Sequence, residues 1–165
     1  MDEKLKTKLS KLKLLALDVD GVLTDGKLFY SENGQEFKAF DVKDGLGLKQ
    51  LIGAGIDIAI ISSRNSIAVE KRAGELGIRH VRQAVRNKLH ALIEVCHELK
   101  IEINECAYMG DDLPDFEVMT GAGISLAVAD AATEIVDLAD WVSSRPGGQG
   151  AVREICEIIL RSLDL

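Results

Sequence analysis

The chain has 165 residues, of which 47% are hydrophobic, and its formal net charge at pH 7 is -7. This length suits one domain with one sizeable core, so we expect residues 1–165 to form a single domain. The acidic balance argues against binding of nucleic acid, or of an anionic membrane, through the overall field of the protein, whereas local charge decides the binding of a small anionic substrate.

The N-terminal segment and the cysteines indicate the compartment. The first residues, MDEKLKTKLSKLK, are too charged for the apolar core of a secretion signal, and no apolar run reaches the length of a membrane span. The three cysteines are widely spaced in apolar stretches: Cys96, Cys106 and Cys156. Such a pattern favours reduced thiols in a core over a disulfide or zinc framework. We therefore expect a cytoplasmic protein.

Short apolar runs alternate with helical patterns along almost the whole chain. In chain order the expected elements are a strand at Leu12–Leu17, a β-hairpin at 27–40, a helix at Leu46–Ala54, a strand at Ile56–Ile61, a helix at Ile67–Leu76, a strand at His80–Arg82, a helix at Lys88–Leu99, a strand at Cys106–Met109, a helix at Asp115–Gly121, a strand at Ile124–Val128, a helix at Ala132–Leu138, a strand at Trp141–Val142 and a helix at Ala151–Leu163. This alternation predicts an α/β fold, a three-layer Rossmann-like parallel sheet with helices on both faces. For one helix the ends are explicit, with Ser66 as the N-cap and Gly77 as the stop.

The hairpin insert interrupts the alternation. Residues 27–40, KLFYSENGQEFKAF, have a polar SENG centre between two runs that contain aromatic residues, which is typical of a β-hairpin. The aromatic side chains are Phe29, Tyr30, Phe37 and Phe40. They would expose apolar surface unless they meet a partner, so we expect the hairpin to seal contacts between subunits. The alternative is that they fold back on their own sheet.

Carboxylates follow two of the expected strands. LLALDVDGVLTDG, residues 14–26, places Asp18 and Asp20 after the first strand, and YMGDDLPD places Asp111, Asp112 and Asp115 after another. Burying a carboxylate without a partner is costly, so these side chains need compensation. In parallel sheets, ligands bind beyond the carboxyl ends of the strands. The acidic groups are therefore expected to converge on one crevice.

The compensation implied by these residues is a cation together with a phosphate. Several carboxylates can share a crevice when a hard cation or shared protons relieve their repulsion, and Mg²⁺ prefers one or two carboxylates plus a phosphate oxygen. A phosphate also needs donors. Ser62, the backbone amides around Ser63 and Arg64, and Lys88 at the start of its helix are suited to supply them.

These motifs, in this order, resemble those of the haloacid dehalogenase superfamily of phosphotransferases. DVDGVLTD is followed by ISSR, a lysine and GDDLPD, and the resemblance covers the chain from Leu12 onward. It implies that Asp18 is the nucleophile that forms an aspartyl-phosphate, and that Asp20 protonates the leaving alcohol and then activates water. It also implies that Ser62 and Lys88, with the amide at Ser63, hold the phosphoryl oxygens.

The same resemblance implies the metal ligands. They would be the carboxylates of Asp18 and Asp111 and the backbone carbonyl of Asp20. Asp112 and Asp115 would orient the site from outside this ligand set.

Two positions depart from the usual motifs of the superfamily. Where many members have T-G after the second strand, this chain has Ser62-Ser63, which keeps the hydroxyl. Where relatives often have Q-G before the lysine, this chain has Gln83-Ala84. The second change leaves the conformation of that loop open.

Most members of the superfamily carry a cap domain, and this chain leaves no room for one. Only the hairpin fits between Asp20 and Ser62, and one helix and one strand fill the interval from Ser62 to Lys88. A capless chain with VKDGLGLKQL, SLAVADA and PGGQGAVREICEIIL resembles the 3-deoxy-D-manno-octulosonate 8-phosphate phosphatase family. Members of that family are tetramers in which neighbouring subunits help to close the site. The resemblance implies hydrolysis of this sugar acid phosphate in lipopolysaccharide precursor synthesis.

Arg64 and Arg72 are the candidates for recognition of the sugar acid. A guanidinium group can donate two parallel hydrogen bonds to a carboxylate, and Arg64 directly follows the expected phosphate loop. Octulosonate phosphatases commonly have arginine at the position of Arg64, whereas phosphatases of nine-carbon 2-keto-3-deoxy sugar acid 9-phosphates can have an acidic residue there. The nine-carbon substrate therefore remains an alternative.

A second alternative comes from a different class of protein. A signalling receiver phosphorylated on aspartate, or a binding module without activity, also uses a parallel sheet with an acidic magnesium site. In a receiver, however, the paired acids precede the phosphorylated aspartate, whereas here the GDD pair follows Asp18. Asp20 also supplies an acid for the leaving group that a receiver lacks.

Overall fold

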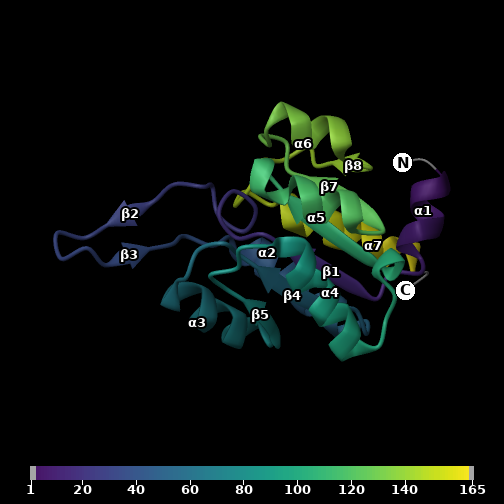
Figure 1. Ribbon diagram of the computed structural model, residues 1–165, viewed down its shortest axis with the longest axis horizontal. Coiled ribbons are helices and arrows are strands. Elements are labelled where there is room, and N and C mark those ends of the chain that lie inside the picture. The colour runs from purple at the N-terminus through teal and green to yellow at the C-terminus, as the bar shows by residue number, and fades with distance from the viewer. Residues whose placement is uncertain (1–2, 164–165) are drawn as a thin grey trace.

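The computed structural model describes residues 3–163, in which six parallel strands form one sheet in the order β5-β4-β1-β6-β7-β8 (Figure 1). The strands are β1 (Leu14–Leu17), β4 (Asp57–Ile61), β5 (His80–Arg82), β6 (Cys106–Gly110), β7 (Ile124–Ala127) and β8 (Trp141–Val142). Strand β1 lies in the middle, and its Leu17 is level with Ile60 of β4 and with Met109 of β6. The predicted parallel α/β sheet is confirmed.

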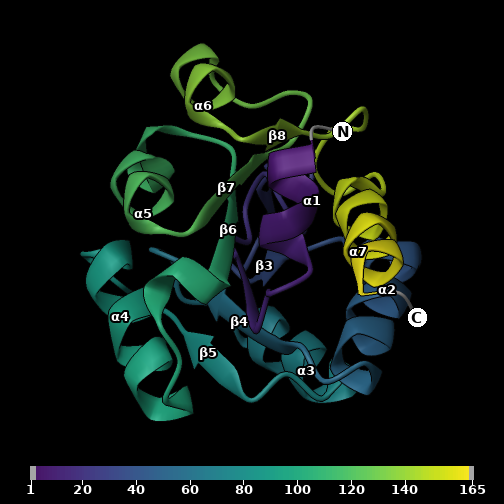
Figure 2. The same cartoon turned by 90° about the vertical axis from the view of Figure 1, so that its right-hand side faces the viewer.

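Helices cover both faces of the sheet, which gives the predicted three layers (Figure 2). One face carries α1 (Glu3–Leu9), α2 (Val42–Gly53), α3 (Ile67–Leu76) and α7 (Ala151–Ser162), and the other carries α4 (Lys88–Leu99), α5 (Phe116–Gly121) and α6 (Thr133–Leu138). In β1, Leu15 and Leu17 join the first core, while Leu14 and Ala16 join the second. Alternate side chains of a strand point to opposite faces, so a strand buried on both sides is apolar throughout.

The boundaries differ from the expected ones in a few places. Helix α1 was not predicted, and two 3₁₀ turns, η1 (Ile103–Glu105) and η2 (Leu113–Asp115), precede β6 and α5. Helix α2 begins at Val42 rather than Leu46 because the side chain of Asp41 accepts a hydrogen bond from the backbone N–H of Lys43 at 2.6 Å. That cap holds the first turn in spite of the glycines that follow it. No helix within residues 3–163 is long and apolar enough to cross a membrane.

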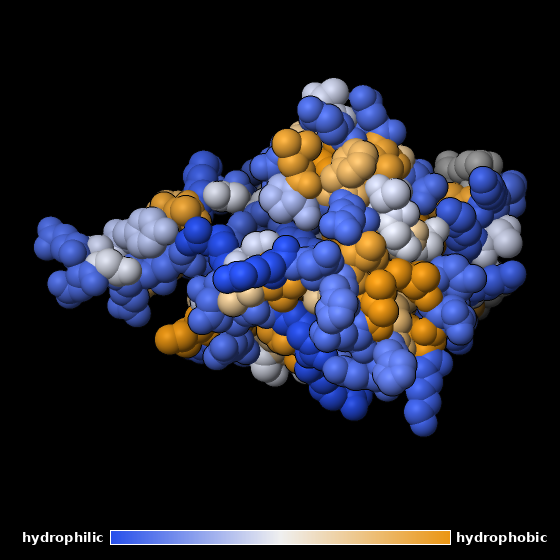
Figure 3. Space-filling model, in the orientation of Figure 1, coloured by the Kyte–Doolittle hydropathy of each residue, from blue (hydrophilic) through white to orange (hydrophobic). Residues whose placement is uncertain are grey.

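The hairpin projects from one end of the sheet, where β2 (Phe29–Tyr30) pairs with β3 (Glu36–Phe37) (Figure 1). Within the subunit Phe29, Tyr30 and Phe37 are 50%, 58% and 51% exposed, whereas Phe40 packs against the core. Apolar groups therefore reach the surface along the hairpin (Figure 3). The alternative that the aromatic side chains fold back on their own sheet holds for Phe40 alone.

The start of α3 is held by a side chain from another loop. Gly77 ends the helix with a φ of 78°, as predicted, but the hydroxyl of Ser66 makes no capping hydrogen bond. Instead, the side-chain amide of Gln83 accepts from the N–H of Ser66 at 2.8 Å and donates to the carbonyl of Ser66 at 3.2 Å. The next residue, Ala84, has a φ of 54°, the left-handed region in which glycine is unstrained. Ala84 thus adopts a conformation that a glycine would take without strain, at a cost of about 1 kcal/mol.

Asp44 is a buried carboxylate that joins α2 to α7. It is 1% exposed, and its Oδ1 accepts a hydrogen bond from the backbone N–H of Arg153 at 2.7 Å. Burial raises the pKa of Asp44 to about 6, against the opposing effect of the hydrogen bond from Arg153. The contact fixes the first turn of α7 against α2.

Asp44→Asn is expected to change how stability depends on pH. Because the pKa of Asp44 is 3.8 ordinarily and about 6 in the folded protein, the folded state binds the proton more tightly, and the wild type loses stability as pH rises between these values. Asparagine keeps an acceptor and stays neutral, so its advantage in free energy of unfolding should grow from about pH 4 to about pH 7, by at most about 3 kcal/mol, and the difference in Tm should grow with it. Thermal unfolding checks this. The exposed Asp137→Asn controls for loss of a charge, and an Asp44→Asn difference that is the same at both pH values would contradict the prediction.

Candidate active site

The carboxyl ends of the three central strands meet at one edge of the sheet, as predicted. Asp18 follows β1, Ser62 follows β4 and Asp111 follows β6. The parallel register brings these ends level, and the backbone N–H of Asp18 continues the ladder by donating to the carbonyl of Met109 at 3.0 Å. The base of the hairpin lies at the same edge (Figure 1).

Lys88 lies between two carboxylates of this edge. Its Nζ is 3.0 Å from Oδ2 of Asp18 and 2.7 Å from Oδ1 of Asp115. It is the first residue of α4, whose start is fixed by the Asn87 side chain accepting from the N–H of His90 at 2.7 Å. Burial lowers the pKa of Lys88, but the charges of the two carboxylates outweigh that effect and raise the pKa overall. The lysine is therefore a fixed cation.

Asp115 is almost fully buried and uses both carboxylate oxygens. Its Oδ1 accepts from Lys88 and from the hydroxyl of Tyr108, the latter at 2.9 Å. Its Oδ2 accepts from the backbone N–H groups of Asp111 at 3.0 Å and of Asp112 at 3.4 Å. A carboxylate with these bonds orients its neighbours and has little capacity left for a metal ion. This supports the role outside the ligand set that was expected for Asp115.

The acidic side chains at this edge lie close enough together to bind a divalent cation. Asp18, Asp111 and Asp115 offer oxygens that lie within 4.8 Å of one another. Burial and the charge of Asp115 raise the pKa of Asp18 to about 6, with Lys88 opposing, and burial and the charge of Asp18 raise the pKa of Asp111 to about 8. A hard cation with oxygen ligands relieves such repulsion. Because Asp115 is already bonded, Asp18 and Asp111 are the carboxylates suited to hold Mg²⁺.

Two glycines allow the loops of this edge to pack closely. Gly21 has a φ of 95°, and a Cβ there would lie 2.0 Å from Oδ2 of Asp111. From the PGGQG segment, a Cβ on Gly147 would lie 1.7 Å from the carbonyl oxygen of Gly21, and the N–H of Gly148 donates to Val22 at 2.9 Å. No larger side chain fits at either glycine, so the PGGQG segment supports the loop after β1.

The serine loop follows β4 at the same edge. Ser62 is buried, and its Oγ accepts a hydrogen bond from the backbone N–H of Arg64 at 3.2 Å. Ser63 is exposed. The loop thus places the hydrogen-bonded hydroxyl of Ser62 and the exposed residue Ser63 near the end of β4. This arrangement is compatible with the phosphate-binding role expected for both serines.

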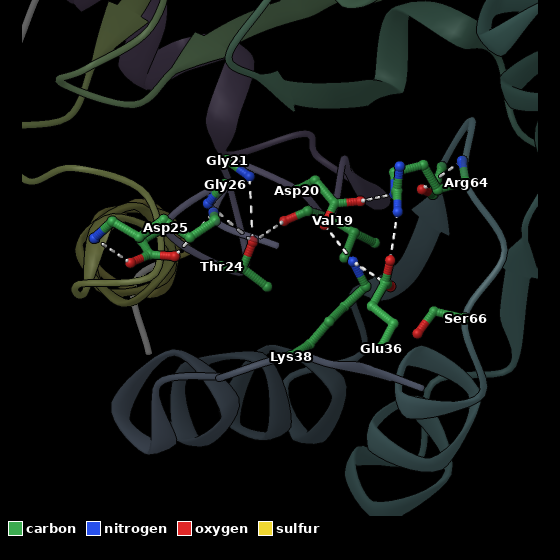
Figure 4. A network of polar contacts seen from close by, with 12 residues as sticks. Val19, Asp20, Gly21, Thr24, Asp25, Gly26, Glu36, Lys38, Arg64 and Ser66 are labelled. Atoms are coloured by element: carbon green, nitrogen blue, oxygen red, sulfur yellow. Dashed lines mark hydrogen bonds and ion pairs between the residues drawn. The ribbon is translucent and has the colours of Figure 1, made fainter. Parts of the chain in front are cut away.

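Asp20 belongs to a second polar network, which it shares with the hairpin (Figure 4). The Nζ of Lys38 forms an ion pair with Oδ1 of Asp20 and lies 3.1 Å from Oε1 of Glu36. Arg64 places Nε 3.6 Å from Oδ2 of Asp20, and its Nη2 donates to Glu36 and, at 3.2 Å, to the hydroxyl of Tyr30. In Figure 4 Glu36 lies between Lys38 and Arg64.

Sequence reasoning missed Lys38, Glu36 and Tyr108. The hairpin pattern predicts two short strands but not which side chains turn back toward β1. Tyr108 stands in an apolar run, and only the fold brings its hydroxyl to Asp115. No local signal in the sequence marks these three residues.

Two predicted residues direct their side chains away from the cluster of Asp18, Lys88 and Asp115. Arg72 donates to the carbonyl of Asp41 at 3.4 Å and lines a small pocket between α2 and α3, because this side of α3 packs toward α2. The structure therefore does not bring Arg72 beside Arg64. The carboxylate of Asp112 is turned to the backbone N–H of Leu113, at 2.8 Å.

An open pocket of about 810 Å³ lies between the hairpin and the first turn of α3. Its lining includes Tyr30, Glu36, Lys38, Arg64 and Lys71. Lys38 and Arg64 contact Asp20, so the pocket borders the edge of the sheet at which Asp18, Ser62 and Asp111 meet. Its volume lies in the range of small-molecule sites.

Known proteins are similar to this chain over nearly its whole length. Residues 78–155 match the haloacid dehalogenase-like hydrolase family. The 3-deoxy-D-manno-octulosonate 8-phosphate phosphatase of Salmonella typhi is 46% identical over 154 residues, which is 93% of this chain and 82% of that protein. Its counterpart in Escherichia coli K12 is 45% identical over 153 residues, 93% of this chain and 81% of that protein.

Solved structures agree with these sequence matches. The phosphatase of Moraxella catarrhalis, in complex with magnesium, phosphate and KDO, is 43% identical with a TM-score of 0.97, covering 99% of this chain and 94% of that one. The cobalt-bound phosphatase of Haemophilus influenzae is 39% identical with a TM-score of 0.92, covering 95% of this chain and 92% of that one. At this identity and coverage, the chain belongs to the 3-deoxy-D-manno-octulosonate 8-phosphate phosphatases within the haloacid dehalogenase-like hydrolases.

Proposed function

We propose that the protein is a magnesium-dependent phosphatase that hydrolyses 3-deoxy-D-manno-octulosonate 8-phosphate to the free sugar acid and phosphate, in lipopolysaccharide precursor synthesis. The observation that carries this proposal is the position of Asp18, which lies against Lys88 at the sheet edge where the partners of Asp20, Lys38 and Arg64, line a pocket large enough for the sugar. The names of the relatives support the substrate. Membership of a phosphatase family argues against the receiver and the inactive binding module.

The proposed reaction uses the two carboxylates in turn. A carboxylate oxygen of Asp18 attacks phosphorus, the bond from phosphorus to the C8 oxygen breaks, and Asp20 gives its proton to that oxygen. Asp20 then takes a proton from water, which attacks the aspartyl-phosphate, releases phosphate and regenerates Asp18. Lys88, 3.0 Å from Asp18, favours the ionised form that the attack requires.

The other groups of the edge bind the phosphate and the metal. We propose that Ser62, Ser63 and Lys88 hold the phosphoryl oxygens. The carboxylates of Asp18 and Asp111 and the carbonyl of Asp20 would hold Mg²⁺, which when bound neutralises charge on the phosphoryl group.

A phosphate-release assay over a panel of sugar acid phosphates tests the function. We expect the highest kcat/KM with 3-deoxy-D-manno-octulosonate 8-phosphate, and we expect the activity to disappear on chelation and to return with Mg²⁺. A higher kcat/KM with a nine-carbon sugar acid 9-phosphate would support the alternative substrate instead. Absence of phosphate release from every compound would overturn the proposal.

Arg64 is proposed to bind the substrate carboxylate, since it lines the pocket beside Asp20. Arg64→Ala should lower kcat/KM for the sugar acid phosphate. The loss should correspond to about 1.5–3 kcal/mol of transition-state binding energy, the cost of a lost charged hydrogen bond. The substitution should affect an aryl phosphate, which has no carboxylate, much less. Arg72→Ala is the matched control, because Arg72 contacts α2 instead. A loss with Arg64→Ala that is equal on both substrates would assign this residue to the phosphate site.

We also propose that the protein works as a homotetramer in the cytoplasm. The support is the hairpin, whose Phe29 and Phe37 are half-exposed in the single subunit. Light scattering should give the mass of four 17.9 kDa chains. The double variant Phe29→Ser and Phe37→Ser should give a smaller species, whereas Phe116→Ser, which removes an exposed aromatic side chain elsewhere, should not. A fully active monomer would refute the assembly.

A further inference from the structure

Lys38 is a cation of the hairpin insert that its surroundings bury almost completely. Its side chain is 1% exposed, although it lies beyond β3 in a segment whose other side chains largely face solvent. Its Nζ is paired on one side with Asp20 and on the other, at 3.1 Å, with Glu36. A lysine that loses its hydration in this way needs such partners, so this geometry is specific rather than one of many surface alternatives.

The contacts of Asp20 leave Lys38 as the group that fixes its carboxylate. Oδ1 of Asp20 is held by Lys38, whereas Oδ2 is buried without a hydrogen bond among the described residues and has only the Nε of Arg64 near it, at 3.6 Å. Arg64 also lies between Asp20 and Glu36, but its side chain is 43% exposed and reaches Oδ2 only at 3.6 Å, whereas Lys38 is buried and holds Oδ1 (Figure 4). Removing Lys38 would therefore turn the Asp20 carboxylate away from its present orientation.

We propose that Lys38 is a positioning residue, which holds the carboxylate of Asp20 in the orientation needed to protonate the departing sugar oxygen. The proposal rests on the function proposed above. Through Lys38, the hairpin takes part in the reaction. Glu36 of β3 pairs with Lys38, and Lys38 pairs with Asp20, so the position of β3 determines the position of the Asp20 carboxylate. Lys38 acts through Asp20 and need not touch the substrate.

The test is a double-mutant cycle with two substrates. The value of kcat/KM reports the steps up to departure of the alcohol, so it isolates the protonation by Asp20. Lys38→Met should lower kcat/KM for the sugar acid phosphate by about 10²-fold, the scale of a misplaced general acid, and should change that for 4-nitrophenyl phosphate only slightly. In an Asp20→Asn background the same change should have almost no further effect. Lys38→Arg should recover much of the activity.

The control is Lys27→Met, which removes another lysine of the same insert, one that is 71% exposed and paired with Asp25. It should leave both substrates unchanged. Equal losses on both substrates with Lys38→Met, or losses that simply add to those of Asp20→Asn, would overturn the proposal, as would unchanged activity. If Lys38→Met does not fold, Lys38→Gln is carried through the same cycle. If the sugar acid phosphate is not hydrolysed by the wild type, the proposed function fails, and the cycle is run on the best alkyl phosphate of the panel.

Discussion

Asp18→Asn is expected to abolish phosphate release, with kcat reduced by about 10⁴-fold or more, the scale seen when a nucleophile is removed. An amide oxygen is a poor nucleophile, and the change also removes one carboxylate from the proposed magnesium ligands. The fold should survive, because asparagine has nearly the same shape and no charge to bury. Since burial and Asp115 raise the pKa of Asp18 to about 6, the ionised wild-type group costs stability near neutral pH. The variant should therefore melt at the same temperature as the wild type or higher.

Steady-state phosphate release and thermal unfolding, measured on the same preparation, separate these two effects. Asp25→Asn is the matched control, because it removes from the same loop a carboxylate that pairs with Lys27 at the surface. It should keep the wild-type rate. Activity retained in Asp18→Asn would show that another group attacks phosphorus, and a large fall in its Tm would show that the residue is mainly structural.

Asp20→Asn should show a loss that depends on the leaving group. A sugar alkoxide must be protonated as it departs, so loss of the acid should lower kcat/KM for the sugar acid phosphate by about 10²–10⁴-fold. A nitrophenolate leaves without a proton, and its kcat/KM should fall far less. The backbone of Asp20, and with it the proposed carbonyl ligand, is unchanged by this substitution.

A series of phosphate esters with leaving groups of different basicity measures this dependence. The slope of log kcat/KM against the pKa of the leaving group should be steeper in Asp20→Asn than in the wild type. The Asp25→Asn variant should keep the wild-type slope. Parallel lines for Asp20→Asn and the wild type would remove Asp20 from the role of general acid and leave it as a residue of the metal or phosphate site.

The core of the fold followed from local patterns. The central strands are apolar at almost every position, Asp57 at the start of β4 being the exception, because they are buried on both faces, so β1, β4 and β6 stood out in the sequence. Carboxylates at the ends of two such strands and serines at the end of a third must meet if the strands are parallel neighbours. The strand order places them together, and the expectation for Asp18, Ser62 and Asp111 needed no more than this.

The sequence could not predict the contacts of side chains whose partners lie far away along the chain. Both strands of the hairpin, β2 and β3, lie between Asp20 and Lys38 along the chain, and the burial of Lys38 depends on how that insert bends back toward β1. Arg72 was expected to help recognise the sugar acid, but the packing of α3 on α2 turns it to Asp41. In both cases the deciding quantity is the rotation of one element against another, which local periodicity does not contain.

The sequence by itself determined the α/β class and which strands are followed by acidic residues, because residue type and spacing along a strand or helix are local properties. The roles proposed for Asp18, Asp20 and Lys88 came from the resemblance of their motifs to those of the haloacid dehalogenase superfamily. Only the tertiary structure showed that the Asp115 carboxylate accepts hydrogen bonds from Lys88 and two backbone amides, and that the hairpin supplies a buried cation to Asp20. Those outcomes depend on burial, since an ion pair becomes strong and specific only where the packed chain excludes water from it.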